Sequence, residues 1–133
     1  MDAKVNMHTE KKALDWANLG FQYHRTDFRF SANWKDGSWN EGELVSSEVI
    51  AVHEGAPSLH YAQQCFEGMK AQTASDGRVL LFRPNLNTER MDLAAARLLM
   101  PAVPRALFMR GVEEAVRVYP SYGMRASCHG TFR

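Results

Sequence analysis

The chain has 133 residues, of which 45% are hydrophobic and 23% charged, a composition that indicates one globular domain and excludes a disordered chain. The net charge is +1 at pH 7 with acids and bases interspersed, so the sequence offers no basic surface for nucleic acid. No apolar run reaches the roughly 20 residues of a membrane-spanning helix, and the N-terminus is too polar for a signal peptide.

Cysteine and histidine spacing argues against a metal site. Cys65 and Cys128 are far apart and have neither the paired spacing of a zinc site nor the density of a disulfide framework. No two of the five histidines have the i, i+4 spacing of helical metal ligands. We therefore expect a soluble cytoplasmic protein without a metal.

The first half of the chain predicts short strands. Residues 1–12 form a polar lead, and Ala13–Phe21 can form a short helix or turn. In Asp27–Trp39, aromatic and polar residues alternate up to an Asp-Gly pair at positions 36–37. That pair favours a tight turn with positive φ and predicts a β-hairpin. Ser47–His53 is predicted to be the third strand, with residues 54–57 as a loop.

A second Asp-Gly pair, at positions 76–77, separates two further strand-like segments, 68–74 and 78–82. We predict another hairpin here. Pro84 prevents its second strand from continuing.

The first of two predicted helices has one apolar stripe at helical spacing, which comprises Met91, Ala94, Ala95, Leu98 and Leu99. Asn85 or Asn87 can cap its start. Glu89 suits the positive end of the helix dipole, and Pro101 ends the helix.

The second predicted helix runs from about Arg105 to Tyr119, where Pro120 stops it. Its apolar face comprises Phe108, Val112, Ala115, Val116 and Tyr119. Strands followed by a helical pair predict an α+β domain with a mostly antiparallel sheet and helices on one face. The last residues have no hydrophobic period and are predicted to be an untethered tail.

Arg90 is a candidate anion-binding residue. We place it in the first turn of the predicted helix, where free N–H groups and the dipole favour an anion, so that an arginine could complete a phosphate site. The alternative is a surface arginine paired with Glu89 or Asp92.

The stretch LHYAQQCFEGMK, residues 59–70, has no clean period. Tyr61 and Phe66 are either core aromatics or walls of a cavity, where a tyrosine hydroxyl can hold a substrate or cofactor group. Lys70 could be a nucleophilic amine, although a solvated lysine at a strand start is the commoner arrangement. The residues alone indicate a soluble α+β domain with a weak anion site and no defined reaction.

Three blocks in order carry a family resemblance: LHYAQQCFEGMKA, DGRVLLFRPNLNTERM and RLLMP. Together with the preceding DWANLGFQYHRTDFRFSANWKDGSWNEGELV, they resemble branched-chain amino-acid aminotransferases, which are fold-type IV enzymes dependent on pyridoxal 5'-phosphate. The similarity covers roughly residues 13–123.

The resemblance implies a two-domain enzyme with the cofactor held between the domains. Residues 13–120 correspond to the small N-terminal domain, preceded by a flexible lead at 1–12 and followed by an aberrant or truncated tail at 121–133.

The resemblance also assigns residues to the site. The family's arginine after FRP binds the cofactor phosphate and matches Arg90. The tyrosine of LHY and the phenylalanines of FEGMK and LGF line the substrate pocket, and they match Tyr61, Phe66 and Phe21. Aromatic walls suit an aliphatic side chain, which has no hydrogen-bonding group.

The family's Schiff-base lysine belongs to the larger C-terminal domain and matches no residue of this sequence. The resemblance therefore assigns no catalytic residue here, and Lys70 is not the catalytic amine. At Tyr122 and Gly123 the sequence matches the start of a substrate-recognition loop but continues as MRASCHGTFR. A truncated or frameshifted product is the corresponding hypothesis.

By resemblance, the function is transamination of leucine, isoleucine or valine with 2-oxoglutarate, and the chain alone is expected to be inactive. The alternative is a non-catalytic fragment that serves as a packing or interaction module. The implied partners are branched-chain amino acids, 2-oxo acids and a second copy in a homodimer, with no nucleic acid and no membrane.

Overall fold

The computed structural model describes residues 18, 23, 25–118, 126–128 and 131–132. Phe21, the lead at 1–12 and the element predicted at 13–21 lie outside the described residues. In chain order the elements are β1 (Arg29–Ala32), β2 (Trp34–Lys35), β3 (Ser38–Trp39), β4 (Glu43–Val45), α1 (Pro57–His60), β5 (Met69–Thr73), β6 (Val79–Leu81), α2 (Pro84–Arg97), α3 (Arg105–Val118), β7 (Ala126–Cys128) and β8 (Thr131–Phe132).

The described strands form two three-stranded sheets and one separate hairpin. The first sheet has the order β4-β1-β8, in which β1 is antiparallel to β4 and parallel to β8. The second has the order β6-β5-β7 and is antiparallel throughout. These short strands and the helices are compatible with the predicted α+β class. The prediction of an untethered tail is wrong for β7 and β8, because both pair with strands of the main body.

Both predicted hairpins are confirmed. Strand β2 pairs with β3 through a turn in which Asp36 (φ 52°) and Gly37 (φ 84°) both have positive φ, as the Asp-Gly pair requires. Trp34 and Trp39 face each other across this hairpin in an edge-to-face contact, with ring centroids 5.7 Å apart. Strand β5 pairs with β6 through the second turn, where Gly77 has φ 84°.

The predicted strand Ser47–His53 is wrong, because these residues form no strand and the strand that precedes them, β4, ends at Val45. Arg29 explains the difference. Its Nε donates to the carbonyl of Ser47 at 3.1 Å and its Nη2 to the carbonyl of Val49 at 3.5 Å. A side chain therefore occupies carbonyl groups that a strand ladder would need.

The predicted asparagine caps of the first helix are also wrong. Helix α2 begins at Pro84, which follows Arg83 in a left-handed conformation (φ 47°, ψ 52°) without a side-chain cap. Proline suits a first helical position because its fixed φ is helical and its missing N–H would have no partner there. Asn85 and Asn87 lie inside the helix. The expectation that Pro84 ends the preceding strand is confirmed.

The end of α2 is a Schellman motif. The N–H of Leu99 donates to the carbonyl of Ala96, and that of Met100 donates to the carbonyl of Ala95 at 2.9 Å. Leu99 occupies the left-handed position, with φ 54°, and is 91% exposed. The apolar stripe is therefore buried only in part, at Met91 and Ala95.

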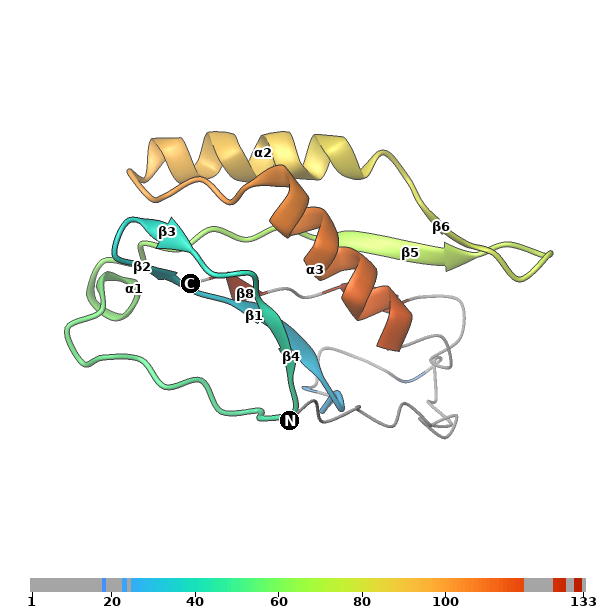
Figure 1. The fold of residues 1–133 in the computed structure, drawn as a ribbon, viewed down its shortest axis with the longest axis horizontal. Coiled ribbons are helices and arrows are strands. Elements are labelled where there is room, and N and C mark those ends of the chain that lie inside the picture. Colours follow the sequence, from blue (N-terminus) through green and yellow to red (C-terminus); the bar gives the residue numbers. More distant parts are fainter. Residues whose placement is uncertain (1–17, 19–22, 24, 119–125, 129–130, 133) are drawn as a thin grey trace.

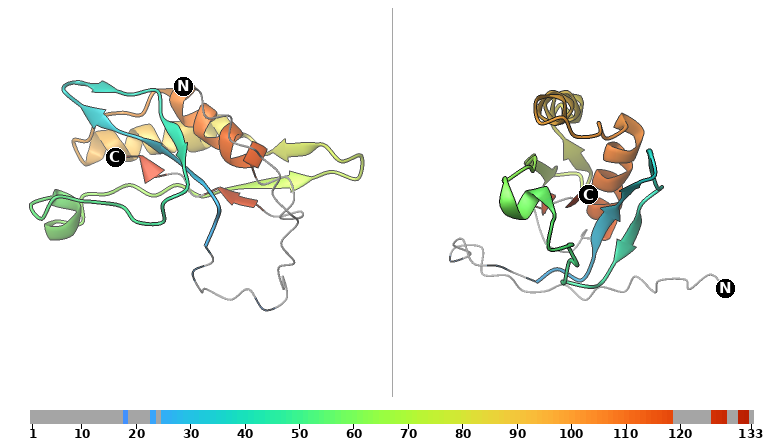
Figure 2. Two further views of the ribbon diagram at one scale, coloured as in Figure 1. Left: turned by 60° about the horizontal axis from the view of Figure 1, so that its bottom comes forward. Right: turned by 90° about the vertical axis from the view of Figure 1, so that its left-hand side faces the viewer.

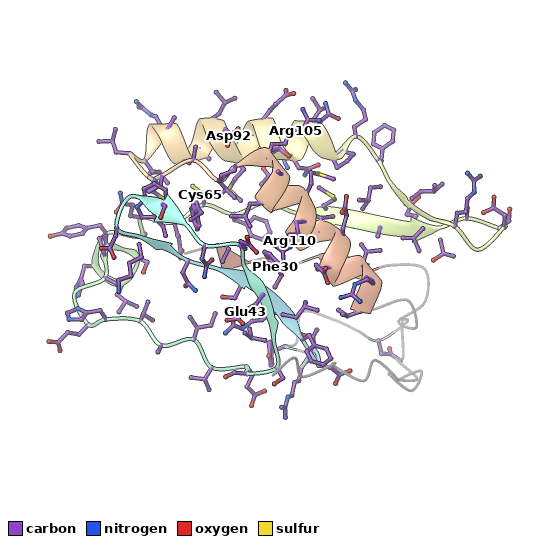
Figure 3. All side chains as sticks on the ribbon, in the orientation of Figure 1. Phe30, Glu43, Cys65, Asp92, Arg105 and Arg110 are labelled. Atoms are coloured by element: carbon purple, nitrogen blue, oxygen red, sulfur yellow. The ribbon has the colours of Figure 1, made fainter. Side chains whose placement is uncertain are left out.

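The second predicted helix is confirmed as α3. It lies between α2 and the paired strands β1 and β4 (Figure 1, Figure 2). Phe30 of β1 lies against α3 (Figure 3). It belongs to a buried cluster that joins the strands to both helices and comprises Phe30, Ala32, Met69, Met91, Val103, Leu107, Phe108 and Val112.

The packing of Phe30 against Gly42 predicts a steric effect. A Cβ added at Gly42 would lie 2.6 Å from Cε1 of the buried Phe30 ring, at a residue with φ +72°. We expect Gly42→Ala to lower the free energy of unfolding by about 3 kcal/mol, combining overpacking with backbone strain. Gly37→Ala is the matched control, with positive φ and nothing within 4 Å, and should cost about 1 kcal/mol. Equal losses in denaturant unfolding would contradict the clash.

Leu99 predicts a gain in stability. Leu99→Gly removes the left-handed strain of an exposed leucine, and after the extra unfolded-state entropy of glycine we expect about 0.5–1 kcal/mol of added unfolding free energy. The same change at Leu93, exposed inside α2, should cost about 1 kcal/mol. Thermal melts of both variants measure the contrast, and a loss at both positions would refute it.

Candidate functional site

The segment from Gln63 to Gly68 is irregular and is held along α2 by side-chain hydrogen bonds. At the C-terminal end of the helix, Nε2 of Gln63 donates to the carbonyl of Leu98 at 2.7 Å. Nearer its N-terminal end, Nδ2 of Asn87 donates to the carbonyl of Gly68 at 3.0 Å. The segment therefore runs antiparallel to α2, which explains why its sequence follows neither a strand nor a helix period.

Glu67 is the central residue of this contact. Its side chain is only 7% exposed. Its two carboxylate oxygens accept hydrogen bonds from Nε of Arg90, from Nη2 of Arg90 at 2.7 Å and from Nδ2 of Asn87 at 2.8 Å. Asn87 and Arg90 are three residues apart on α2, so both donors project from the same face of the helix. Glu67, Asn87 and Arg90 are called the carboxylate clamp below.

The hydrogen bonds of the clamp favour the charged forms of both Glu67 and Arg90. The hydrogen bond from Arg90 is the main reason that the pKa of Glu67 lies below its ordinary value, with Asn87 and Gly68 contributing in the same direction and burial opposing them. The hydrogen bond to Glu67 raises the pKa of Arg90. A buried carboxylate requires such donors, because an unpaired buried charge is very costly.

Arg90 retains donors for a further anion. A guanidinium group carries five N–H groups, and the pair with Glu67 uses one on Nε and one on Nη2. The second N–H of Nη2 and one N–H of Nη1 form the adjacent end-on edge, and neither has a partner among the described residues. The Arg90 side chain is 67% exposed. It can therefore bind an oxyanion without releasing Glu67.

Two sequence expectations about Arg90 are wrong. Because α2 begins at Pro84, Arg90 lies in the second turn, beyond the free N–H groups of the first. Its partner is Glu67, not Glu89 or Asp92. Any anion affinity at this position must come from the guanidinium group.

Two of the three predicted pocket aromatics are among the described residues, and both lie at the surface. Tyr61, which follows α1, is 83% exposed and Phe66 is 77% exposed. The core alternative is therefore wrong for both. Lys70 is the second residue of β5 and is exposed, which fits the solvated alternative. A pocket role for Tyr61, Phe66 and Phe21 stays a prediction.

Glu67 is the site residue that sequence reasoning missed. The available signal was a carboxylate between Phe66 and Gly68 in a largely apolar segment, since buried carboxylates need partners. Its partners lie 20 and 23 residues further along the chain.

Metal and membrane features are absent from the part of the chain that the structure describes. No three His, Cys, Asp or Glu residues in it gather into a possible metal site. None of its helices is both long and apolar enough to cross a membrane.

Comparison with known proteins gives a consistent set of relatives. The chain is 56% identical over 106 residues to a branched-chain-amino-acid aminotransferase of Haemophilus influenzae and 51% identical over 104 residues to one of Helicobacter pylori. It is 43% identical over 104 residues to the mitochondrial branched-chain-amino-acid aminotransferase 1 of Arabidopsis thaliana. No protein-family model matches the chain.

The matches with the two bacterial enzymes cover 80% and 78% of this chain but 31% of each enzyme. The chain thus spans about a third of the length of the curated relatives that it matches. The resemblance inferred from the sequence blocks is confirmed, and the coverage is consistent with an N-terminal portion of such an enzyme.

The clamp predicts a pH dependence of stability. Because the pKa of Glu67 is depressed in the folded chain, its contribution is present above the unfolded-state pKa, about 4.3 for a glutamate, and is lost as the pH falls through the folded value. Glu67→Gln should lower the melting temperature at neutral pH. The difference from the unchanged chain should shrink below about pH 4. A constant difference in melts across this range would contradict the linkage.

Proposed function

We propose that this chain, a homologue of branched-chain-amino-acid aminotransferases, provides the cofactor-phosphate contact and one wall of the substrate pocket of such an enzyme. The observation that supports this most directly is the exposed edge of Arg90. Its guanidinium group is held along the Nε–Nη2 edge by the buried Glu67 and offers N–H donors on its end-on edge. The relatives supply the reaction class.

The residues present fit the phosphate end of pyridoxal 5'-phosphate. A guanidinium edge with two or more N–H groups matches the spacing of phosphate oxygens and forms charge-assisted hydrogen bonds with them. When bound, the cofactor supplies the electron sink for transamination. Arg90 would bind and orient the phosphate, and the described residues are assigned no proton transfer.

The exposed aromatics fit an aliphatic substrate side chain. Tyr61 and Phe66 present large apolar surfaces, and Phe21 joins them by resemblance. We assign leucine, isoleucine or valine as amino donors and 2-oxoglutarate as acceptor, in a cytoplasmic homodimer. The lysine that links the cofactor belongs to the family's larger domain, so the 133 residues alone are proposed to bind phosphate without turnover.

A second candidate is a non-catalytic packing module. Exposed large apolar side chains favour it, namely Val49, Val52, Leu59, Tyr61 and Phe66, which follow one another between β4 and β5. Such a surface is suited to burial against another protein surface. This candidate requires no selective affinity for pyridoxal 5'-phosphate, so a binding measurement separates the two.

Arg90→Ala tests the proposal. We expect it to weaken binding of pyridoxal 5'-phosphate by the 133-residue chain about 10-fold or more, since hydrogen bonds between charged groups are lost. Binding of pyridoxal, which lacks the phosphate, should not change. Calorimetric titration measures both ligands.

Arg78→Ala is the matched control, because Arg78 is also an exposed arginine paired with a carboxylate, that of Asp76 in the β5–β6 turn. Its affinity for the phosphate ligand should equal that of the unchanged chain. Equal weakening by both variants, or no phosphate-dependent binding by the unchanged chain, would overturn the assignment.

A further inference from the structure

We infer that Glu67 is a positioning residue for anion binding: it fixes the guanidinium plane of Arg90 so that the unoccupied edge faces the phosphate. The inference rests on the proposed phosphate contact of Arg90 and adds a residue that does not itself touch the ligand. It comes from the position of Glu67 in the clamp, where a buried carboxylate meets an exposed guanidinium group.

An exposed arginine needs such a constraint. Its flexible side chain carries about 2 kcal/mol of rotamer entropy, and freezing it on ligand binding opposes association. In this structure Nε and Nη2 of Arg90 are both bonded to Glu67. Two parallel hydrogen bonds define the plane as well as the position of the guanidinium group. Part of the ordering therefore takes place before any ligand binds.

Glu67 can hold Arg90 because it is itself held. Its side chain is almost fully buried. The amide of Asn87 donates both to Oε2 of Glu67 at 2.8 Å and to the carbonyl of Gly68 at 3.0 Å. The carboxylate is thus fixed relative to α2 and to the backbone of its own segment. Because Arg90 is bonded to both carboxylate oxygens, the orientation of the carboxylate also fixes that of the guanidinium group.

A competing interpretation predicts the opposite change in anion affinity when Glu67 is replaced. If Glu67 were only a counter-ion, its negative charge would weaken the attraction between Arg90 and a phosphate. Removing that charge would then tighten anion binding. If positioning dominates, the same change weakens anion binding, although the net charge of the site becomes more positive.

Glu67→Gln separates these interpretations. Glutamine keeps the size of the side chain but replaces one acceptor oxygen with an NH₂ group. Arg90 therefore loses a bond in either orientation of the amide, and Asn87 also loses one when the NH₂ group replaces Oε2. We expect the Kd of the 133-residue chain for pyridoxal 5'-phosphate to rise about 5- to 10-fold, the range of one constrained charged hydrogen bond. In an Arg90→Ala background the added effect of Glu67→Gln should vanish.

Glu114→Gln is the matched control. Glu114 accepts from Nε and Nη2 of Arg117 on α3 and is partly buried, with 27% of its side chain exposed. This variant should bind pyridoxal 5'-phosphate as the unchanged chain does. Unchanged or tighter binding by Glu67→Gln would overturn the positioning role. An unchanged affinity of Arg90→Ala would overturn the proposed function instead, so the two failures are distinguishable.

A readout without ligand completes the test. In ¹⁵N NMR, the Nε–H resonance of Arg90, assigned by its loss in Arg90→Ala, should exchange slowly with water in the unchanged chain and faster in Glu67→Gln. Glu67→Asp keeps both oxygens on a shorter side chain and should give intermediate exchange, which covers the case in which the glutamine variant does not fold. Equal protection of the resonance in every foldable Glu67 variant would refute the constraint.

Discussion

One buried carboxylate determines how the irregular segment and helix α2 fit together. Glu67 is almost fully buried, and an ionised group in that position is tolerated only with charged or amide donors around it. Both donor residues come from one face of α2. The segment cannot shift along the helix without separating the carboxylate from Arg90 or Asn87. Its register is therefore fixed by a few polar contacts in place of a strand ladder.

The core and the clamp use adjoining parts of the same helix surface, since Asn87 lies one turn before Met91. Met91 belongs to the buried cluster, and Ala95, one turn further along, is also buried. Asn87 and Arg90 project toward the irregular segment. Because Arg90 immediately precedes Met91, packing of the methionine fixes the backbone from which the guanidinium group extends. The anion-binding edge thus depends on the hydrophobic core through the helix, as well as on Glu67.

Sequence patterns predicted the local elements well and the long-range contacts poorly. The Asp-Gly turns and α3 follow from interactions within a few residues, which a single sequence displays directly. The strand expected at Ser47–His53 is absent because Arg29, about 20 residues earlier, takes its carbonyl groups. The partner of Arg90 was sought among its neighbours on the helix, although it lies 23 residues away. The spacing of residues along the helix identifies Arg90 as a candidate, whereas its partner is determined by the burial of Glu67, which a single sequence does not display.

The clamp also explains why this position calls for arginine. With α2 beginning at Pro84, the free N–H groups of the first turn do not support an anion at Arg90. The side chain alone must satisfy a buried carboxylate and bind a ligand in a fixed direction. A lysine ammonium group would form a point contact with Glu67, and its other protons could rotate around the bond. The planar guanidinium group holds its side-on pair of donors (Nε and Nη2) and its end-on pair (Nη1 and Nη2) at a fixed angle, so engagement of the side-on edge by Glu67 sets the direction of the end-on edge.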